Sequence, residues 1–487
     1  MEKQPGKNAA LAECLRELGW PPSMLARKIN KLFGVGTVSP SAPYHWVRNG
    51  GVPRAPLPAL TAQVLSQHLG RPIRVGELWQ ERAANSPLLW PANSGMEMPW
   101  SAAGTLRILE DWLLSGLMDR RIFLAVSGAA LTGLAWEYLG LESQRLLAAI
   151  EGDGIGAELI TQLEGTIPAL WALDDAHGGA RVLPHVSAQF QTAAHILRQG
   201  APGTRVARQL FQIVAKLGQH AGWAAFDAGR HGLAQRYYFT ALRAAHQAGD
   251  RRLAVHILAD LAFQAASRDE RQDAGELAEI AMRAAATTPA RVRASVAGRA
   301  AFAHGVAGDA DAFAACRDLA YEQLDHIQPQ DGDPDWMYYL TTGHVDALAG
   351  AALVRLAQTA KTQGRPRQAK IWVRESVGLL RGRDGAARRD AKHPHQRRAA
   401  VEGAWLALAH TLHGDLEQTC QVGRLTISRL GAVQSDRCST ALTALRGELR
   451  SGRMNNPDVR EFVGELDRTL HRQPPRHDAV SAQGPGG

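Results

Sequence analysis

Apolar residues recur every three or four positions along most of the chain, and no stretch convincingly alternates apolar and polar residues as a β-strand does. In the first ninety residues this helical pattern is cut into short segments by glycine and proline. Leu11, Leu15 and Leu18, for example, form a stripe that ends at Gly19. The pattern predicts helices within residues 11–20, 21–34, 39–51 and 58–70, with residues 73–79 closing a small bundle.

The third of these segments carries side chains suited to reading DNA. Ser41 is preferred to Ser39 as its N-cap, because Pro43 then falls in the first turn, where its missing N–H costs nothing. Trp46 is expected to point inward and anchor this helix. In a helix-turn-helix domain the second helix crosses the DNA backbone and the third enters the major groove. The expected base-facing residues are Ser41, Tyr44, His45 and Arg48, and the residues expected near phosphates are Arg27, Lys28, Lys31 and Arg54.

The distribution of charge favours the same interpretation. The formal net charge of the chain is +8, and residues 1–95 contribute most of it, with eleven Lys and Arg against five Asp and Glu. A small basic unit of this kind is typical of nucleic-acid-binding domains. The alternative is a small helical protein-interaction domain with a solvated basic face.

A repeated pattern appears from residue 215 and resembles tetratricopeptide repeats, in which paired helices pack through small residues. Gly222 lies in a first helix and Gly229 at the turn, followed at offsets of 5, 9 and 12 by Ala234, Tyr238 and Ala241. The offsets recur as Ala274, Ala278 and Ala281 after Asp269, as Phe313, Arg317 and Ala320 after Gly308, as Ala369, Val373 and Ser376 after Gly364, and in a weaker copy after Gly414. Successive units are 40, 39, 56 and 50 residues apart, so the repeats are irregular, but each helix pair can bury its face only against its neighbours.

The expected fold is therefore all-α, with an N-terminal helix-turn-helix bundle followed by a tetratricopeptide-like α-solenoid. The low aromatic content of 6% agrees with helices, because aromatic residues favour strands. The expected organisation is a DNA-binding domain at 1–83, a linker rich in Pro, Asn, Ser and Gly at 84–100, a helical connecting region at 101–200, the repeats at 201–472 and a disordered tail at 473–487.

Composition also bears on the compartment. The four cysteines are far apart, without the spacing of a zinc site or a disulfide framework, which fits a reducing cytoplasm. No apolar run reaches the roughly 18–20 residues that a membrane span needs. The expected location is the cytoplasm, with no contact with a membrane.

One segment resembles an export signal. Arg120 and Arg121 precede fifteen residues without a charge, and the next charged residue is Glu137, as in a twin-arginine signal. Signals stand at the N-terminus, however, and no clear A-x-A cleavage site closes this run. Phe123, Val126, Ala130 and Leu134 would instead form one face of a buried helix, and that structural role is the expectation.

Other candidate motifs carry little chemistry. The glycines of EGDGIG at 151–156 follow a helix and not a strand, which predicts a turn and not a nucleotide cradle. Asp174, Asp175 and His177 make a weak metal site and are interpreted as an exposed helix end. The run at 381–398, with seven Lys and Arg, is read as a solvated loop, with a second phosphate contact as the alternative. With no catalytic motif, we expect no enzyme, no cofactor and no metal.

The segments LRELGWPPSMLARKIN, YHWVRNGGVPR and LSQHLGRPIRVGELW resemble the XRE-type (Cro/repressor-like) domain of a group of large actinomycete regulators that carry tetratricopeptide-like repeats. In those regulators a helix with a central Trp, followed by Gly and a VPR-like turn, occupies the recognition position, matching Trp46 and residues 52–54 here. A similar internal DRRxFL stretch recurs in them. The resemblance implies a regulator of development or antibiotic production that binds DNA.

The expected function is thus a transcriptional regulator that binds double-stranded DNA as a homodimer, the dimer being inferred from half-site geometry. Its repeats would sense a peptide, a small molecule or a protein partner and would mediate dimerisation. The architecture also resembles that of peptide-pheromone receptors, whose grooves hold peptides with asparagines, although this chain has no Asn between residues 94 and 454. The alternatives are a scaffold that uses both parts for protein contacts and an exported binding protein.

Overall fold

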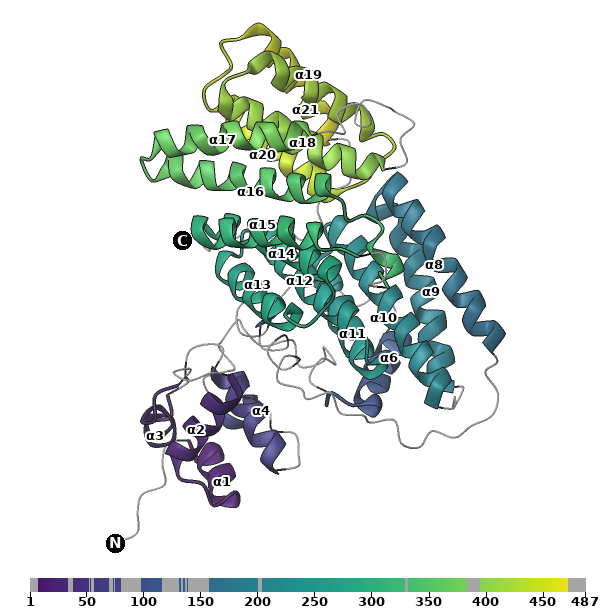
Figure 1. The fold of residues 1–487 in the computed structure, drawn as a ribbon, viewed down its shortest axis with the longest axis vertical. Coiled ribbons are helices and arrows are strands. Elements are labelled where there is room, and N and C mark those ends of the chain that lie inside the picture. Colours follow the sequence, from purple (N-terminus) through teal and green to yellow (C-terminus); the bar gives the residue numbers. More distant parts are fainter. Residues whose placement is uncertain are drawn as a thin grey trace, which may run out of the picture. The chain divides into compact units, whose positions relative to one another are not determined.

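The computed structural model describes residues 8–33, 38–51, 53, 57–69, 73, 75–79, 98–115, 131–132, 135, 138, 157–199, 204–328, 332–382 and 395–471. The chain divides into two compact units, one formed by residues 1–111 with 126–146 and the other by residues 112–125 with 147–487. Within the described residues every regular element is a helix, so the all-α expectation is confirmed (Figure 1).

The first unit contains a bundle of short helices whose apolar stripes meet in one core. Leu11 and Leu15 of the first helix are buried, as are Leu25 and Ile29 of the second and Trp46 of the third. The helices are α1 (Ala9–Glu17), α2 (Pro22–Phe33), α3 (Ala42–Asn49), α4 (Leu57–Leu69) and α5 (Val75–Leu78), followed along the chain by α6 (Ala102–Ser115).

Two asparagines and a glycine fix the ends of these helices. The Asn8 side chain accepts a hydrogen bond from the backbone N–H of Leu11 and so caps α1. The Asn30 side chain donates to the carbonyl of Val38 and accepts from its N–H, both at 2.8 Å, which holds the start of the α3 region against α2. Gly50 follows α3 with a φ of 64°, a left-handed conformation that glycine adopts without a Cβ penalty.

The second unit is a series of antiparallel helix pairs, coloured from blue through green to yellow in Figure 1. The two members of each pair are neighbours along the chain and pack on each other. The pairs are α8 (Ala157–His177) with α9 (Gly179–Gln199), α10 (Thr204–Asp227) with α11 (His231–Ala248), α12 (Arg251–Ser267) with α13 (Arg271–Ala285), α14 (Ala290–Ala307) with α15 (Ala310–Asp325), α16 (Thr342–Thr362) with α17 (Pro366–Arg381) and α18 (Gln396–His413) with α19 (Leu416–Arg429), followed by α20 (Asp436–Arg450) and α21 (Pro457–His471).

The turns inside five of these pairs lie where the sequence pattern predicts them. Gly229, Asp269, Gly308, Gly364 and Gly414 all have positive φ values, between 61° and 93°. Asp269 is the one described residue other than glycine with such a backbone, and aspartate is among the few residues that tolerate it. The predicted turn positions are therefore confirmed.

The small residues of the pattern allow close helix approach, as expected. Gly222 of α10 faces Tyr238 of α11, and a Cβ at position 222 would lie 2.6 Å from Cδ1 of that ring. Tyr238 is fully buried, and so are Ala234 and Ala241 on the same helix. Glycine at 222 is thus required by the packing of the pair.

The succession of pairs closes on itself, because its last helices contact its first ones. The backbone N–H of Gln434 donates to the carbonyl of His177 at 3.0 Å, between the segment before α20 and the end of α8. The Ser435 hydroxyl donates to Asp227 of α10 at 2.7 Å, and both groups are buried. The first helices of the pairs consequently surround a common interior.

No helix within the described ranges is long and apolar enough to cross a membrane. The segment from Met118 to Ala130, with the twin arginine, lies outside the described residues, as do the glycine-rich motif at 151–156 and the tail beyond His471.

Candidate functional site

The first candidate site is the exposed face of α3. Tyr44, His45 and Arg48 are exposed, and the Tyr44 side chain is 56% accessible. Their spacing of three and four residues places them on one side of the helix. Pro43 and Trp46 are buried on the other side, so the inward orientation expected for Trp46 is observed.

Ser41 directly precedes α3 and is exposed, but it does not cap the helix. Its φ and ψ of −89° and −19° are helical, whereas an N-cap serine needs an extended backbone to reach the N–H groups of the first turn. No cap hydrogen bond is formed, and the Ser41 hydroxyl lies 3.4 Å from that of Ser39. The capping role predicted for Ser41 is therefore wrong, although Pro43 does fall in the first turn.

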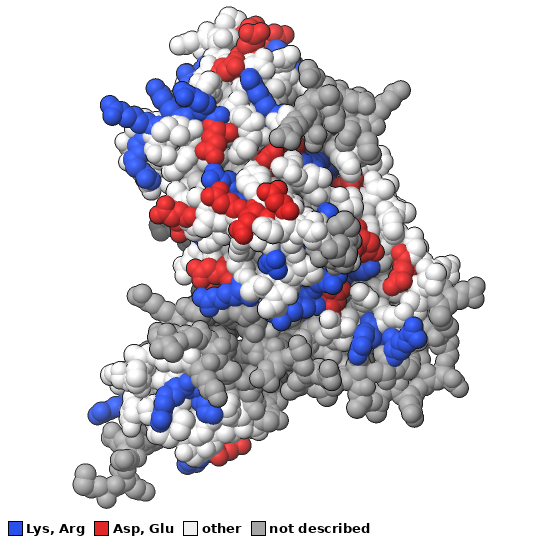
Figure 2. Space-filling view, viewed as in Figure 1, with Lys and Arg blue, Asp and Glu red and all other residues white. Residues whose placement is uncertain are grey.

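The residues expected near phosphates are placed in part. Arg27 of α2 is exposed, while Lys28 is half-buried with its ammonium 5.4 Å from the centre of the Trp20 ring. Lys31 lies in the last part of α2, and its side chain is outside the described residues, as is all of Arg54. Figure 2 shows lysine and arginine side chains on the N-terminal bundle, with few acidic ones in the same view.

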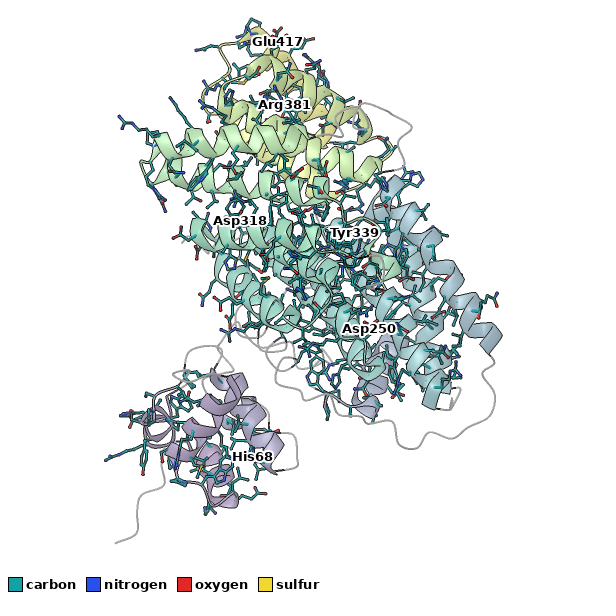
Figure 3. All side chains as sticks on the ribbon, in the orientation of Figure 1. His68, Asp250, Asp318, Tyr339, Arg381 and Glu417 are labelled. Atoms are coloured by element: carbon teal, nitrogen blue, oxygen red, sulfur yellow. The ribbon has the colours of Figure 1, made fainter. Side chains whose placement is uncertain are left out.

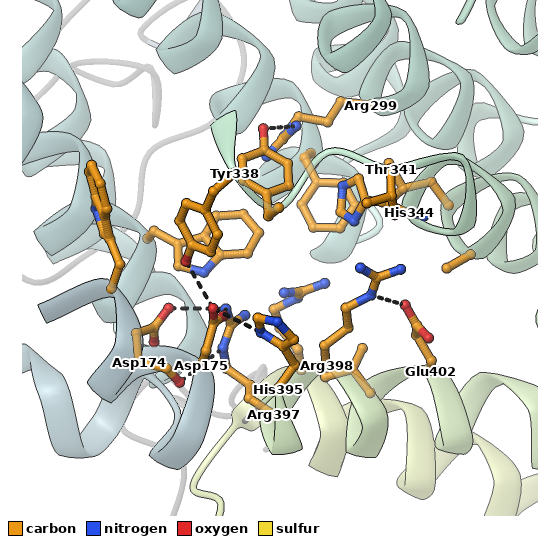
Figure 4. Close-up of a pocket in the computed structure, with 18 of the residues that line it drawn as sticks. Asp174, Asp175, Arg299, Tyr338, Thr341, His344, His395, Arg397, Arg398 and Glu402 are labelled. Carbon is orange, nitrogen blue, oxygen red and sulfur yellow. Dashed lines mark hydrogen bonds and ion pairs between the residues drawn. The ribbon is translucent and has the colours of Figure 1, made fainter. Parts of the chain in front are cut away.

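The second candidate site is a pocket of about 200 Å³ inside the second unit (Figure 4). The volume far exceeds the roughly 10–15 Å³ that one water needs. Its walls come from α8, α10, α12, α14, α16, α18 and the start of α20, together with the segment that joins α15 to α16. These are the first helices of the pairs, so the second helices cover the outside.

An arginine at the start of α18 joins this side of the pocket to α8. Nη2 of Arg397 lies 3.0 Å from Oδ2 of Asp174 and 3.1 Å from Oδ1 of Asp175. Asp175 also accepts hydrogen bonds from the Tyr338 hydroxyl at 2.9 Å and contacts Nδ1 of His395 at 3.1 Å. Three segments distant in sequence thus meet at two adjacent carboxylates.

The segment between α15 and α16 forms another wall. Tyr339 lies in the middle of the unit (Figure 3), where its hydroxyl is 2.9 Å from that of Ser295 and accepts from Nη1 of Arg299 at 3.0 Å. The Trp336 indole stacks at a tilt on the His256 ring, with 4.7 Å between centroids. A 3.0 Å ion pair between Asp335 and Lys216 ties the segment to α10.

Trp223 of α10 is the centre of the pocket floor, because three guanidinium groups surround its indole. The guanidinium carbons of Arg437, Arg397 and Arg299 lie 4.9, 5.7 and 5.9 Å from the ring centroid. At these distances a cation is attracted to the face of an indole, and most strongly when both are buried. The floor is therefore an aromatic ring bordered by three guanidinium groups, two of which are paired with carboxylates.

Burial shifts several of these groups away from their charged forms. Desolvation raises the pKa of Asp174 to about 7, with Arg397 acting in the opposite direction. Desolvation also lowers the pKa of His220 to about 3 and that of His256 to about 4, so both imidazoles are neutral near pH 7. The pKa of Arg437 falls to about 10, again through burial, and its guanidinium stays charged.

Several buried polar atoms around the pocket have no hydrogen-bond partner among the described residues. They include both ring nitrogens of His220, Nδ1 of His256, Nε2 of His344 and Oδ1 of Asp174. Buried polar groups are nearly always partnered in folded proteins, so such a cluster marks a place prepared for another molecule or for water.

Two sequence interpretations are corrected here. α8 does end at His177, but Asp174 and Asp175 are buried, with 3% and 7% exposure, and so are not an exposed helix end. Arg397 belongs to the run at 381–398 expected to be a solvated loop, yet its side chain is only 10% exposed. The sequence was misleading because Arg397 and the two aspartates bury each other although they are more than 220 residues apart in the chain. Residues 383–394 of that run lie outside the described residues.

Sequence reasoning therefore missed the pocket as a site. The available signal was a set of charged residues on helix faces that the repeat pattern needs buried, such as Asp260 and Arg299. A buried charge requires a partner, and these partners lie on other helices. Among the side chains that the structure describes, no three His, Cys, Asp or Glu residues form a group that could hold a metal ion.

Comparison with known families bears on the first unit. Residues 11–78 match the family model described as the SP15 N-terminal domain, so this stretch is similar to that domain. The match runs from the first turn of α1 to the end of α5. No curated protein matches the chain.

Proposed function

We propose that this chain is a DNA-binding transcriptional regulator, whose first unit binds double-stranded DNA and whose second unit receives a small effector in its pocket. The observation that carries the proposal is the outward face of α3. A helix held by a buried tryptophan and exposing a tyrosine, a histidine and an arginine on its other side has the form of a recognition helix.

The surroundings of α3 support this role. The Asn30 side chain ties α2 to Val38, and such a connection would keep a recognition helix at a fixed angle to the helix before it. The exposed Arg27 on α2 is available for a phosphate, and residues 1–95 carry an excess of basic residues. Together these features support a helix-turn-helix domain in which Ser41, Tyr44, His45 and Arg48 read bases.

The second unit supports a sensor more than a scaffold. Its interior holds a pocket with buried charges and with polar atoms that have no partner among the described residues, whereas a scaffold would present its recognition surface on the outside. A pocket of about 200 Å³ also suits a small molecule better than an extended peptide. We propose that the helix pairs form a tetratricopeptide-like solenoid and that the regulator acts as a cytoplasmic homodimer on paired half-sites.

The test begins with the operator. The protein is crosslinked to DNA in cells of its own species, and the recovered DNA is sequenced to define a shared motif. Binding of that motif is then measured by fluorescence anisotropy for the wild type and for Arg48→Ala, Lys28→Ala and Arg16→Ala. Arg16 is the matched control, because it lies on α1, is exposed and is paired with Glu13.

A base contact by Arg48 predicts a loss of roughly 1–3 kcal/mol and weaker discrimination between operator variants. A phosphate contact by Lys28 predicts a uniform loss of affinity and a smaller salt dependence. Recovery of DNA no better than with Arg48→Ala would refute the DNA-binding role, and the scaffold would become the working hypothesis if partner proteins still bound that variant.

A further inference from the structure

We infer that the pocket binds a small organic monoanion, a carboxylate on a flat apolar body, and that Arg437 receives the carboxylate. The inference rests on the proposed effector role of the second unit and names the chemical class of that effector. It is carried by the geometry of one arginine and by the apolar wall beside it, and the balance of charges limits the number of charges on the ligand.

Arg437 is a partly buried cation, with its side chain 16% exposed, and it has no hydrogen-bonded partner in the described part of the chain. Its guanidinium lies over three rings, 4.9 Å from Trp223, 5.6 Å from Phe226 and 4.9 Å from Phe263. The nearest carboxylate is that of Asp227, with 4.0 Å between Nη1 and Oδ1, beyond hydrogen-bond distance. Rings attract the faces of a guanidinium and leave its N–H donors available to a ligand.

Asp227 is itself occupied by other groups. One of its oxygens accepts from the backbone N–H of Gly179 at 2.9 Å, and the other accepts from the Ser435 hydroxyl at 2.7 Å. Asp227 therefore neutralises part of the field of Arg437 without satisfying its donors.

The position of Arg437 in its helix points the same way. It is the second residue of α20, in the first turn, where the helix dipole disfavours a cation and favours an anion. A carboxylate bound there would accept two hydrogen bonds from the guanidinium and interact favourably with the helix terminus.

The other arginines of the pocket differ from Arg437 because each has a carboxylate at close range. Arg299 is 3.0 Å from Asp260, and Arg398 is 2.6 Å from Glu402. Arg397 bridges the two aspartates of α8, as described above. Among the arginines lining the pocket, Arg437 is thus the one whose donors are open to a ligand, within the ranges that the structure describes.

An apolar wall accounts for the body of the ligand. Phe302 packs on Phe263 with 4.8 Å between centroids and on the edge of Trp405 at 6.3 Å, and these rings face the pocket beside Leu348 and Val401. Ring faces and branched aliphatic side chains together favour a flat apolar group. The rest of the lining is largely polar and charged, with Asp175, His344 and Glu402 in different parts of the pocket wall (Figure 4).

The charge balance limits the ligand to one negative charge. Four arginines line or enter the pocket, and five carboxylates lie among them, from Asp174, Asp175, Asp227, Asp260 and Glu402. A second negative charge would meet this excess of carboxylates, with no arginine left to oppose it. A carboxylate therefore suits the site better than a phosphate dianion.

The test uses the full chain without DNA and three probes that share one ring system: 2-naphthoate, its neutral amide 2-naphthamide, and the dianion 2-naphthyl phosphate. Binding is measured by isothermal titration calorimetry. We expect 2-naphthoate to bind at least about tenfold more tightly than either other probe, because it alone offers a single charge to Arg437.

Variants then assign the binding to Arg437. Arg437→Met keeps the length of the side chain and removes its charge, and we expect it to weaken 2-naphthoate binding by at least about tenfold while leaving 2-naphthamide unchanged. Arg450→Met is the matched control on the same helix, since Arg450 is exposed and paired with Asp467. Ala347→Phe, which fills the pocket and keeps Arg437, should abolish binding of both probes.

Equal binding of 2-naphthoate and 2-naphthamide, or no saturable binding of 2-naphthoate up to about 5 mM, would overturn the inference. Tighter binding of the phosphate would replace the carboxylate class with a phosphate class. Operator binding is measured separately on the same preparations. If the protein binds its operator but shows no preference for 2-naphthoate, this inference is refuted and the proposed function stands. If it prefers 2-naphthoate but binds no operator, the DNA-binding regulator is refuted and this inference stands.

Discussion

Replacing Arg397 with Met should open the ring of helices that encloses the pocket. In the wild type this guanidinium is the charged partner within hydrogen-bond distance of Asp174, and His220 stands 4.0 Å away in its neutral form. Asp175 keeps the Tyr338 hydroxyl after the substitution, whereas Asp174 keeps no cation at close range. Breaking a buried ion pair from one side costs about 3–5 kcal/mol, because the remaining charge is uncompensated.

The pH dependence distinguishes this electrostatic cost from a simple loss of packing. Burial already raises the pKa of Asp174 to about 7, and removing Arg397 removes the main group that opposes that rise. A carboxyl with a raised pKa in the folded state is least costly when protonated, and the folded state loses stability as the pH rises through that pKa. The difference between wild type and Arg397→Met should therefore be larger at about pH 8.5 than at about pH 6.

The assay is urea unfolding followed by circular dichroism at both pH values. Arg450→Met, which removes one exposed ion pair, should change the free energy of unfolding by no more than about 1 kcal/mol. The double variant Asp174→Asn with Arg397→Met should recover part of the loss, since it removes the buried charge as well as its partner. An Arg397→Met protein as stable as the wild type at the higher pH, or a loss that shrinks as the pH rises, would refute the reasoning.

Three further outcomes follow from the structure. Gly222→Ala should lower the free energy of unfolding by about 1–3 kcal/mol, because its Cβ would meet a buried tyrosine ring. Gly275→Ala on α13, with open space around it, should raise the free energy of unfolding by about 0.5–1 kcal/mol. Urea midpoints at constant slope check both variants, and equal effects would contradict the close approach of α10 and α11. His220 and His256 have folded-state pKa values of about 3 and 4, below the 6.5 of an ordinary histidine, so they withdraw stability as the pH falls from about 6.5 to 4; replacing either with Gln should flatten that fall in a pH series of thermal unfolding, and an unchanged slope would contradict it. Gly50→Ala should cost about 1 kcal/mol, measured by thermal unfolding, because the residue after α3 has a φ of 64°, and no loss would show that this turn adapts.

Local features of the fold were determined by the sequence alone. The helical period, the five turn residues with positive φ and the outward face of α3 could all be read from residues close together in the chain. These features could be predicted because helix periodicity and left-handed turns depend on neighbours within four or five residues. The small residues that allow α10 and α11 to approach could be found in the same way, since Gly222 and Tyr238 belong to one repeat unit.

The pocket was decided by tertiary structure only. Its closure joins Asp174 to Arg397 and Asp227 to Ser435, pairs more than 200 residues apart, and no short pattern relates them. The rotation of each helix pair against the next determines whether the ends of the series meet, and that rotation depends on interfaces between pairs and on irregular connections such as the one between α15 and α16. Read singly, Asp174 suggested an exposed helix end and Arg397 a solvated loop. Only when the series closes do these charges exclude water from each other, and only then does the Arg437 guanidinium come to lie against the rings of the pocket.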